Sequence, residues 1–236
     1  MTKKQRLSIL FEKWQRKLGT DYLVDDGIVD ESSFEETKPR ILYLLKEPND
    51  NGGKKSWSLT EYIRKVTLKE KGYSPGQFCG TLARWSYGLL NGYPCWHTIE
   101  TLKQGSMLNI LNKIAILNIK KTGGTGSADE KEIKTHLHAH KEEILEEIRI
   151  VAPEIVICCG VGHLWMQEFP NNVTVHNSPT GLQWFEFALA QEFSPRKFLC
   201  FAHPSRPMEK AIMYSYYLDG IRSDETLRKG FCIPPR

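Results

Sequence analysis

The sequence has no apolar run close to the roughly 20 residues that a membrane-spanning helix needs. Its basic N-terminus is followed by Glu12, Lys13 and Arg16 instead of the apolar core of a signal peptide. Neither a glycine period nor a long heptad pattern is present, which excludes collagen-like and coiled-coil proteins. We therefore expect a cytoplasmic globular protein that does not bind membranes.

A Cys-x-x-Cys motif and a strong excess of one charge are also absent. The six cysteines form no Cys-x-x-Cys motif and no regular framework, so we expect most of them to be free thiols. The 32 Lys and Arg residues against 28 Asp and Glu give a formal net charge of +4, which permits a polyanionic partner without requiring one. Hydrophobic residues make up 40% of the 236 residues, which is enough for one sizeable core.

Motifs for nucleotide or metal chemistry are incomplete. Residues 160–162 read Gly-Val-Gly and lack the third glycine of a dinucleotide fingerprint, and no Walker motif is present. His136, His138 and His140 form an alternating run, in which His136 and His140 would share one helical face. No third ligand follows at a matching spacing, so we favour a solvated helix over a metal site and expect no cofactor. A metal hydrolase built on this run is one alternative function.

Short apolar segments alternate with helical patterns along the chain. Buried strands are predicted at residues 40–45, 114–119, 155–160 and 197–202. Helices are predicted at residues 8–14, 58–71, 77–90, from Ser127 or Asp129 to about residue 151, and at 209–221. Residues 25–36 are predicted to be a loop. The alternation favours a three-layer α/β/α fold around a mostly parallel sheet, in one domain over residues 1–236, with residues 1–36 as an N-terminal helical extension.

Polar residues follow three of the predicted strands. Glu47, Asn49 and Asp50 come after the first strand, Asn118 ends the second, and His203 follows the last. Each of these residues alone is commonly a cap or a turn former. In parallel sheets, however, ligands bind beyond the carboxyl ends of the strands, so we expect these residues to share one site.

The order of these motifs resembles that of the uracil-DNA glycosylase superfamily. Residues 44–50 stand where that superfamily has an apolar strand and a proline-containing loop that activates water. Residues 116–120 match a strand ending in an asparagine that reads the base, and residues 203–205 match a closing His-Pro-Ser motif. Residues 123–160 follow the scheme of the family 4 branch, with a glycine-rich loop, a long helix and a strand ending in glycine. The resemblance extends over roughly residues 40–213.

This resemblance implies a monofunctional DNA glycosylase that acts on a flipped-out pyrimidine and leaves an abasic site. It implies that Glu47 organises water, with Asp50 as the competing carboxylate, and that His203 stabilises the departing base. Asn118 would read the edge of the base. The alternative from another class is a catalytically idle module of the same fold that binds DNA or a base.

The sequence also departs from the family 4 branch. That branch carries four cysteines for an iron–sulfur cluster, one of them directly after the asparagine strand, where this chain has Lys120 or Lys121. We therefore expect no cluster. Enzymes strict for uracil often have a bulky tyrosine after the loop proline, whereas this chain has Asn49. The extra room leaves both uracil and a modified pyrimidine open, including a modified cytosine of phage DNA, and with them a role in DNA repair or in antiviral defence.

Aromatic and basic residues near the motifs complete the expected DNA site. Trp57 is the candidate to stack on the flipped base, with Phe78 and Trp85 as competitors. Met208 is the candidate for the apolar tip of a wedge in the duplex. DNA is the expected partner of a monomeric protein, and we expect its phosphates to contact Lys54, Lys55, Lys120, Lys121, Ser205 and Arg206.

Overall fold

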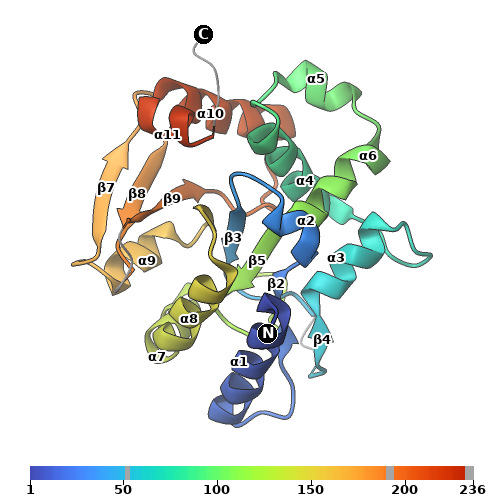
Figure 1. Cartoon of the computed structure of the whole chain (residues 1–236), viewed down its shortest axis with the longest axis vertical. Helices are drawn as coiled ribbons and strands as arrows, with labels where there is room; N and C mark the ends of the chain where they lie inside the picture. The colour runs from blue at the N-terminus through green and yellow to red at the C-terminus, as the bar shows by residue number, and fades with distance from the viewer. Residues whose placement is uncertain (51–53, 190–193, 232–236) are drawn as a thin grey trace.

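A computed structural model of the chain describes residues 1–50, 54–189 and 194–231. Its centre is a seven-stranded mixed sheet with the order β2-β5-β3-β6-β9-β8-β7 (Figure 1). The four central strands, β5, β3, β6 and β9, run parallel, while β2, β8 and β7 run antiparallel to their neighbours. The strands are β2 (Gly27–Ile28), β3 (Ile41–Leu45), β5 (Ile114–Asn118), β6 (Ile155–Cys159), β7 (Val173–Asn177), β8 (Gln183–Phe187) and β9 (Arg196–Phe201). A separate two-stranded parallel sheet pairs β1 (Val24–Asp25) with β4 (Trp57–Ser58).

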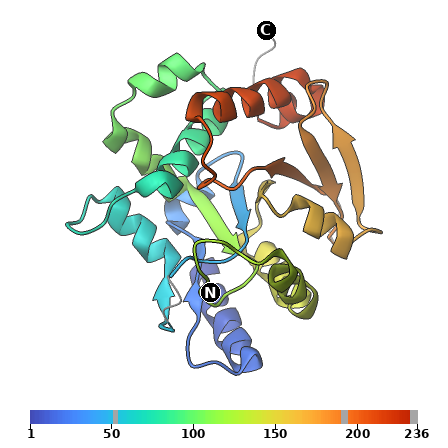
Figure 2. The ribbon, with the colours of Figure 1, turned by 180° about the vertical axis from the view of Figure 1, so that it is seen from behind.

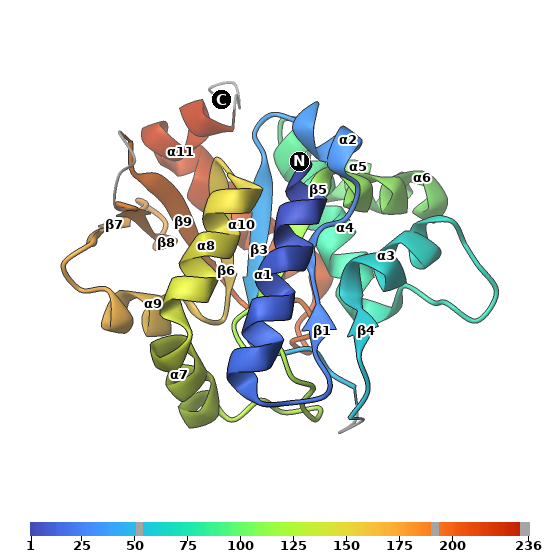
Figure 3. The same cartoon turned by 60° about the horizontal axis from the view of Figure 1, so that its bottom comes forward.

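Helices cover both faces of the sheet. Figure 3 shows α1 and α8 side by side in front of one face, and Figure 2 shows α4 and α10 next to each other on the opposite face. The first face is covered by α1 (Lys3–Leu18), α7 (Glu130–Ala139), α8 (Lys141–Val151) and α9 (Gly162–Glu168), with Phe34 of α2 (Glu31–Glu35) in the same core. The second is covered by α3 (Leu59–Thr67), α4 (Gly76–Leu90), α5 (Trp96–Thr101), α6 (Gln104–Leu108), the 3-10 helix η1 (Asn109–Lys113), α10 (Lys210–Ser223) and α11 (Glu225–Gly230).

The central strands are continuous apolar runs because each of their faces is covered. All five residues of β3 are buried. Tyr43 and Leu45 pack into the core under α3, α4 and α10, whereas Leu42 and Leu44 pack into the core under α1 and α8. Successive side chains of a strand point to opposite faces, so a sheet covered on both sides needs apolar residues at every position.

The α/β class and the four predicted central strands are confirmed, but the sheet is mixed because the hairpin of β7 and β8 and the short strand β2 add antiparallel edges. The prediction of a loop over residues 25–36 is wrong, since this segment contains β2 and α2. Within residues 1–36, β2 pairs with β5, and α1 buries Phe11 and Trp14 in the core, so this segment is packed into the central fold. The single helix predicted up to residue 151 is two helices that meet at His140. None of the described helices is long and apolar enough to span a bilayer.

A buried cluster of charged groups connects α1, β2, β5 and α8. The Lys121 side chain, shortly after β5, is fully buried; its ammonium pairs with Asp26 and lies 2.7 Å from Glu147 Oε2 on α8. Phe11 and Trp14 of α1 each place a ring centroid 5.1 Å from the same ammonium. Burial by itself lowers the pKa of Lys121, but the Asp26 and Glu147 carboxyls outweigh it and raise that pKa. Lys121 therefore stays charged in the interior.

The second acid of the cluster is Glu147. Burial, and then the nearby Asp26 carboxylate, raise the pKa of Glu147 well above its ordinary value. This shift favours the protonated form of Glu147, so Asp26 is the main partner of the Lys121 charge. The negative charge of Asp26 thus offsets the positive charge of the buried Lys121.

Replacing Lys121 with Met should lower the free energy of unfolding by about 3–5 kcal/mol, because Asp26 would be left as an unpaired buried charge. Urea unfolding followed by circular dichroism measures this loss. Lys54→Met is the matched control, since Lys54 is exposed, and it should change stability by less than about 0.5 kcal/mol. Equal stability of the two variants would show that the cluster does not hold these elements together.

Candidate active site

Three strands of the sheet end around one cavity. Leu45 at the end of β3 lies opposite Asn118 at the end of β5, and β9 lies beyond β6 in the same parallel set. The loops that follow these strands enclose a cavity of about 320 Å³, within the range of small-molecule sites. It is lined by Leu45, Glu47, Pro48, Asn49, Trp57, Leu59, Tyr62, Phe78, Asn118, His203 and Ser205.

Glu47 reaches this cavity from the loop after β3 and is held by an ion pair. Lys120 Nζ donates to Glu47 Oε2 at 2.8 Å and lies 2.9 Å from Glu132 Oε1 on α7. Burial alone lowers the pKa of Lys120, but the hydrogen bonds and charges of the two carboxylates raise it overall. Lys120 is therefore a charged group that orients Glu47 from inside the protein.

The predicted phosphate contacts of Lys120 and Lys121 do not agree with this structure. Lys120 is 6% exposed and Lys121 is 1% exposed, and both ammonium groups are engaged by carboxylates. The two adjacent lysines point to different partners, so neither side chain is free to reach DNA. Lys54, Lys55 and Arg206 are exposed, and Ser205 is exposed at the cavity, so these four positions are accessible.

A glycine turn after β5 closes against the loop that carries Glu47. The Gly124 amide donates to the Pro48 carbonyl at 2.9 Å, and Gly124 forms a bridge with Asn49. A Cβ atom on Gly124 would overlap the Glu47 carboxylate, and one on Gly123 would overlap that of Asp50. Glu47 thus faces the cavity, whereas Asp50 packs against the glycine turn outside the residues that line it.

Asn118 is almost completely buried and is fixed by the carboxylate of Asp26, which directly precedes β2. Its backbone amide donates to Asp26 Oδ2 at 2.7 Å, and its side-chain Nδ2 donates to the same oxygen at 3.1 Å. No sequence motif points to Asp26, which lies in an acidic stretch that is distant along the chain. Only the pairing of β2 with β5 brings it to Asn118.

His203 follows β9 and is a neutral hydrogen-bond donor. Burial, and then the charge of Lys46, lower the pKa of His203 to about 4, so its ring is uncharged at neutral pH. The Ser205 backbone amide donates to Nδ1 at 3.2 Å, which leaves the ring proton on Nε2. Lys46 lies beside this ring, since a Cβ on Gly160 would lie 3.7 Å from Lys46 Cε and 3.9 Å from His203 Cβ.

Aromatic rings form one wall of the cavity. Trp57 and Tyr62 meet edge to face with centroids 6.4 Å apart, and Phe78 lines the same space. Trp57 and Phe78 are therefore placed where a ring could stack on a ligand. Trp85 is not, because it is buried in the core against Phe201 and outside the lining. Met208, the predicted wedge, is 40% exposed.

The three histidines of the alternating run do not converge on one point. His138 Nδ1 lies 3.0 Å from Glu168 Oε1, while His140 packs against Trp14 with centroids 5.9 Å apart. The rings of His136 and His140 are 5.7 Å apart. Within the described part of the chain, no three His, Cys, Asp or Glu side chains are gathered as a metal site would require.

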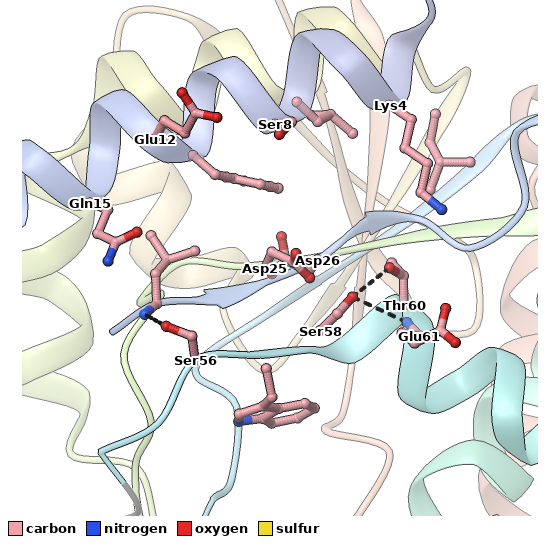
Figure 4. A pocket seen from close by; sticks show the side chains of 15 residues that line it. Lys4, Ser8, Glu12, Gln15, Asp25, Asp26, Ser56, Ser58, Thr60 and Glu61 are labelled. Atoms are coloured by element: carbon pink, nitrogen blue, oxygen red, sulfur yellow. Dashed lines mark hydrogen bonds between the residues drawn. The ribbon is translucent and has the colours of Figure 1, made fainter. Parts of the chain in front are cut away.

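A second cavity, of about 540 Å³, lies between α1, the β1 segment and the β4 segment (Figure 4). Asp25 and Asp26 face it from one side, and Ser8 and Glu12 of α1 line the other. Burial raises the pKa of Asp25. Trp57 lines both cavities, so the two lie next to each other at this residue.

No family model matches this sequence, and no curated protein is significantly similar to it.

The protonation state of His203 can be measured directly. In NMR of protein labelled with ¹⁵N-histidine, His203 should titrate near pH 4 and stay in its Nε2–H form at higher pH. Lys46→Met should raise that pKa, because the neighbouring positive charge is removed. A pKa near the ordinary value of about 6.5 in the unmodified protein would contradict the buried, neutral ring.

Proposed function

We propose that this protein is a monofunctional DNA glycosylase that hydrolyses the N-glycosidic bond of a flipped-out pyrimidine and leaves an abasic site. The observation that carries the proposal is the gathering of Glu47, Asn118 and His203, far apart in the sequence, around one cavity with an aromatic wall. The order of their motifs resembles the uracil-DNA glycosylase superfamily, and helices on both faces of a sheet with parallel central strands agree with such a fold.

Glu47 supplies the negative charge that this reaction needs near the sugar. As the glycosidic bond breaks, positive charge builds on the sugar and negative charge on the leaving base. A carboxylate beside the anomeric carbon orients the attacking water and stabilises the cationic sugar. The ion pair with Lys120 and the close approach of Gly124 hold the Glu47 carboxylate in one place, so little reorganisation is needed during the reaction.

His203 stabilises the leaving base as a neutral donor. Its Nε2–H is available for a hydrogen bond to the pyrimidine O2, where negative charge develops. A donor with its pKa near 4 stays uncharged, so it does not attract a carboxylate or a phosphate into the cavity. Trp57 or Phe78 stacks on the base, and Asn118 reads its edge.

Exposed residues close in sequence to the cavity lining could contact a DNA strand. Lys54, Lys55, Ser205 and Arg206 are exposed and remain our candidates for phosphate contacts. Asn49 lines the cavity in place of a bulky tyrosine, which leaves room for a substituent on the base. Whether the enzyme serves repair or antiviral defence depends on the base that it removes.

Glu47→Gln and His203→Ala should each slow base excision by on the order of 10², the effect of losing one preorganised electrostatic group. DNA affinity should be retained, because both groups act mainly in the transition state. Alkaline cleavage of oligonucleotides that contain uracil or 5-substituted pyrimidines measures excision. If the unmodified protein binds these oligonucleotides and yields no cleavage from any of them, it is the idle binding module instead.

Gly124→Ala should slow excision about 10-fold or more, since its methyl group would displace the Glu47 carboxylate. Gly126→Ala is the matched control in the same turn, because a Cβ there meets nothing within 4 Å. It should excise at the normal rate. Equal rates for the two variants would show that the position of Glu47 does not matter for the reaction.

A further inference from the structure

Three aromatic rings form a row that leads from the candidate active site to the surface. Trp57 and Tyr62 both line the cavity, with ring centroids 6.4 Å apart. The third ring, that of Tyr73, has its centroid 5.9 Å from the centroid of Tyr62, and Tyr73 is 36% exposed. The row therefore begins at the wall of the cavity and ends in solvent, which packing of the core alone does not require.

The outer end of this row is held in place by two hydrogen bonds. Tyr62 Oη donates to the Ser74 carbonyl at 2.9 Å, which fastens the turn after α3 to the wall of the cavity. Lys65 Nζ on α3 donates to Tyr73 Oη at 3.3 Å and lies 5.0 Å from the centroid of the Tyr73 ring. The turn between α3 and α4 extends away from the body of the protein (Figures 1 and 3). An exposed aromatic ring is thus presented in a defined position beside a positive charge.

The positive charge of the chain is concentrated in the segment that carries this row. Residues 54–75 contain six Lys and Arg residues and two Glu residues, which gives this segment a net charge of +4. The formal net charge of the whole chain is also +4, so the charges of the remaining residues sum to zero. A local excess of this kind attracts a polyanion, and the aromatic rings beside it favour a polyanion that carries flat apolar groups.

We propose that residues 54–75 are a binding surface for single-stranded DNA, on which a base that flanks the target stacks on Tyr73 while the target base enters the cavity. This inference rests on the proposed glycosylase function. Proteins that bind single strands combine basic side chains, which contact phosphates, with aromatic rings, on which successive bases stack. The row from Trp57 to Tyr73 and the basic residues of this segment supply both elements next to the cavity.

The exposed ring of Tyr73 favours a single strand over a duplex. Bases in a duplex stack on one another and present their edges, so a ring on the protein surface meets no free face. An unpaired base has a free face and can stack on the ring whatever its identity. A target in a single strand also enters the cavity without the cost of breaking a base pair. We therefore expect single-stranded DNA to be the preferred substrate.

The first measurement tests the strand preference without any excision. Fluorescence anisotropy gives the affinity of the unmodified protein for a labelled purine strand of about 15 nucleotides, alone and paired with its complement. Both titrations use one salt concentration, because phosphate contacts depend on salt. We expect the single strand to bind about 10-fold more tightly, the effect of stacking one additional base. Equal or tighter binding of the duplex would overturn the inference.

The second measurement tests the ring itself. Tyr73→Leu should weaken binding of the single strand about 10-fold and leave binding of the duplex unchanged, whereas Tyr73→Phe should keep the affinity because it keeps the ring. Tyr216→Leu is the matched control, since Tyr216 is 46% exposed and lies outside the residues that line the cavity. It should bind both forms normally. Unchanged binding of the single strand by Tyr73→Leu, or an equal loss in Tyr73→Phe, would overturn the inference.

Excision is scored separately, on single strands and duplexes that contain uracil or a 5-substituted pyrimidine. In Tyr73→Leu we expect KM for the single strand to rise about 10-fold with kcat unchanged, because the ring contacts a flanking base and not the reacting atoms. A fall in kcat with an unchanged KM would overturn this role of Tyr73. Release of no base from either form of DNA would overturn the glycosylase function, whereas the anisotropy results decide the binding surface independently of it.

Discussion

The carboxylate of Asp26 connects the interior of the protein to the candidate active site. One of its oxygens neutralises the buried Lys121, around which α1 and α8 pack, and the other holds the backbone and the side chain of Asn118. Both contacts depend on β2 pairing with β5 at the edge of the parallel strands. The same carboxylate that makes a buried lysine tolerable therefore also orients a residue at the bottom of the cavity.

Two adjacent lysines pair with two different carboxylates near the site. Lys121 turns into the core and pairs with Asp26, while Lys120 pairs with Glu47, which lines the cavity. Ion pairs removed from water add little net stability, because desolvation costs about as much as the pairing returns. The two ion pairs contribute by holding the carboxylates of Glu47 and Asp26 in fixed positions. Beside them His203 is kept neutral, so the residues that line the cavity include a fixed carboxylate and an uncharged donor. This arrangement matches a reaction that creates a cation on the sugar and an anion on the base.

Local patterns were sufficient to predict the parts of the fold and site that depend on strand ends. Buried strands such as β3 can be predicted because they are apolar runs in the sequence. Glu47, Asn118 and His203 lie at or just after the ends of such runs, so the parallel sheet brings them together. Asp26 could not be found this way, because its partner Asn118 is 92 positions away and the surrounding acidic stretch is typical of a loop. Nor does sequence distinguish a lysine that contacts solvent from one that pairs in the interior, which is why Lys120 and Lys121 were assigned to DNA. The β7–β8 hairpin was missed because β7 is mostly exposed and has no apolar run.

Release of a pyrimidine base from DNA at this cavity can be tested directly. Mass spectrometry of the small molecules liberated from a panel of genomic DNAs tests it without choosing the substrate in advance. We expect one free pyrimidine, an intact sugar–phosphate backbone bearing abasic sites, and the loss of that product in Glu47→Gln. The absence of any free base across the panel, or a product whose yield does not depend on Glu47, would contradict it.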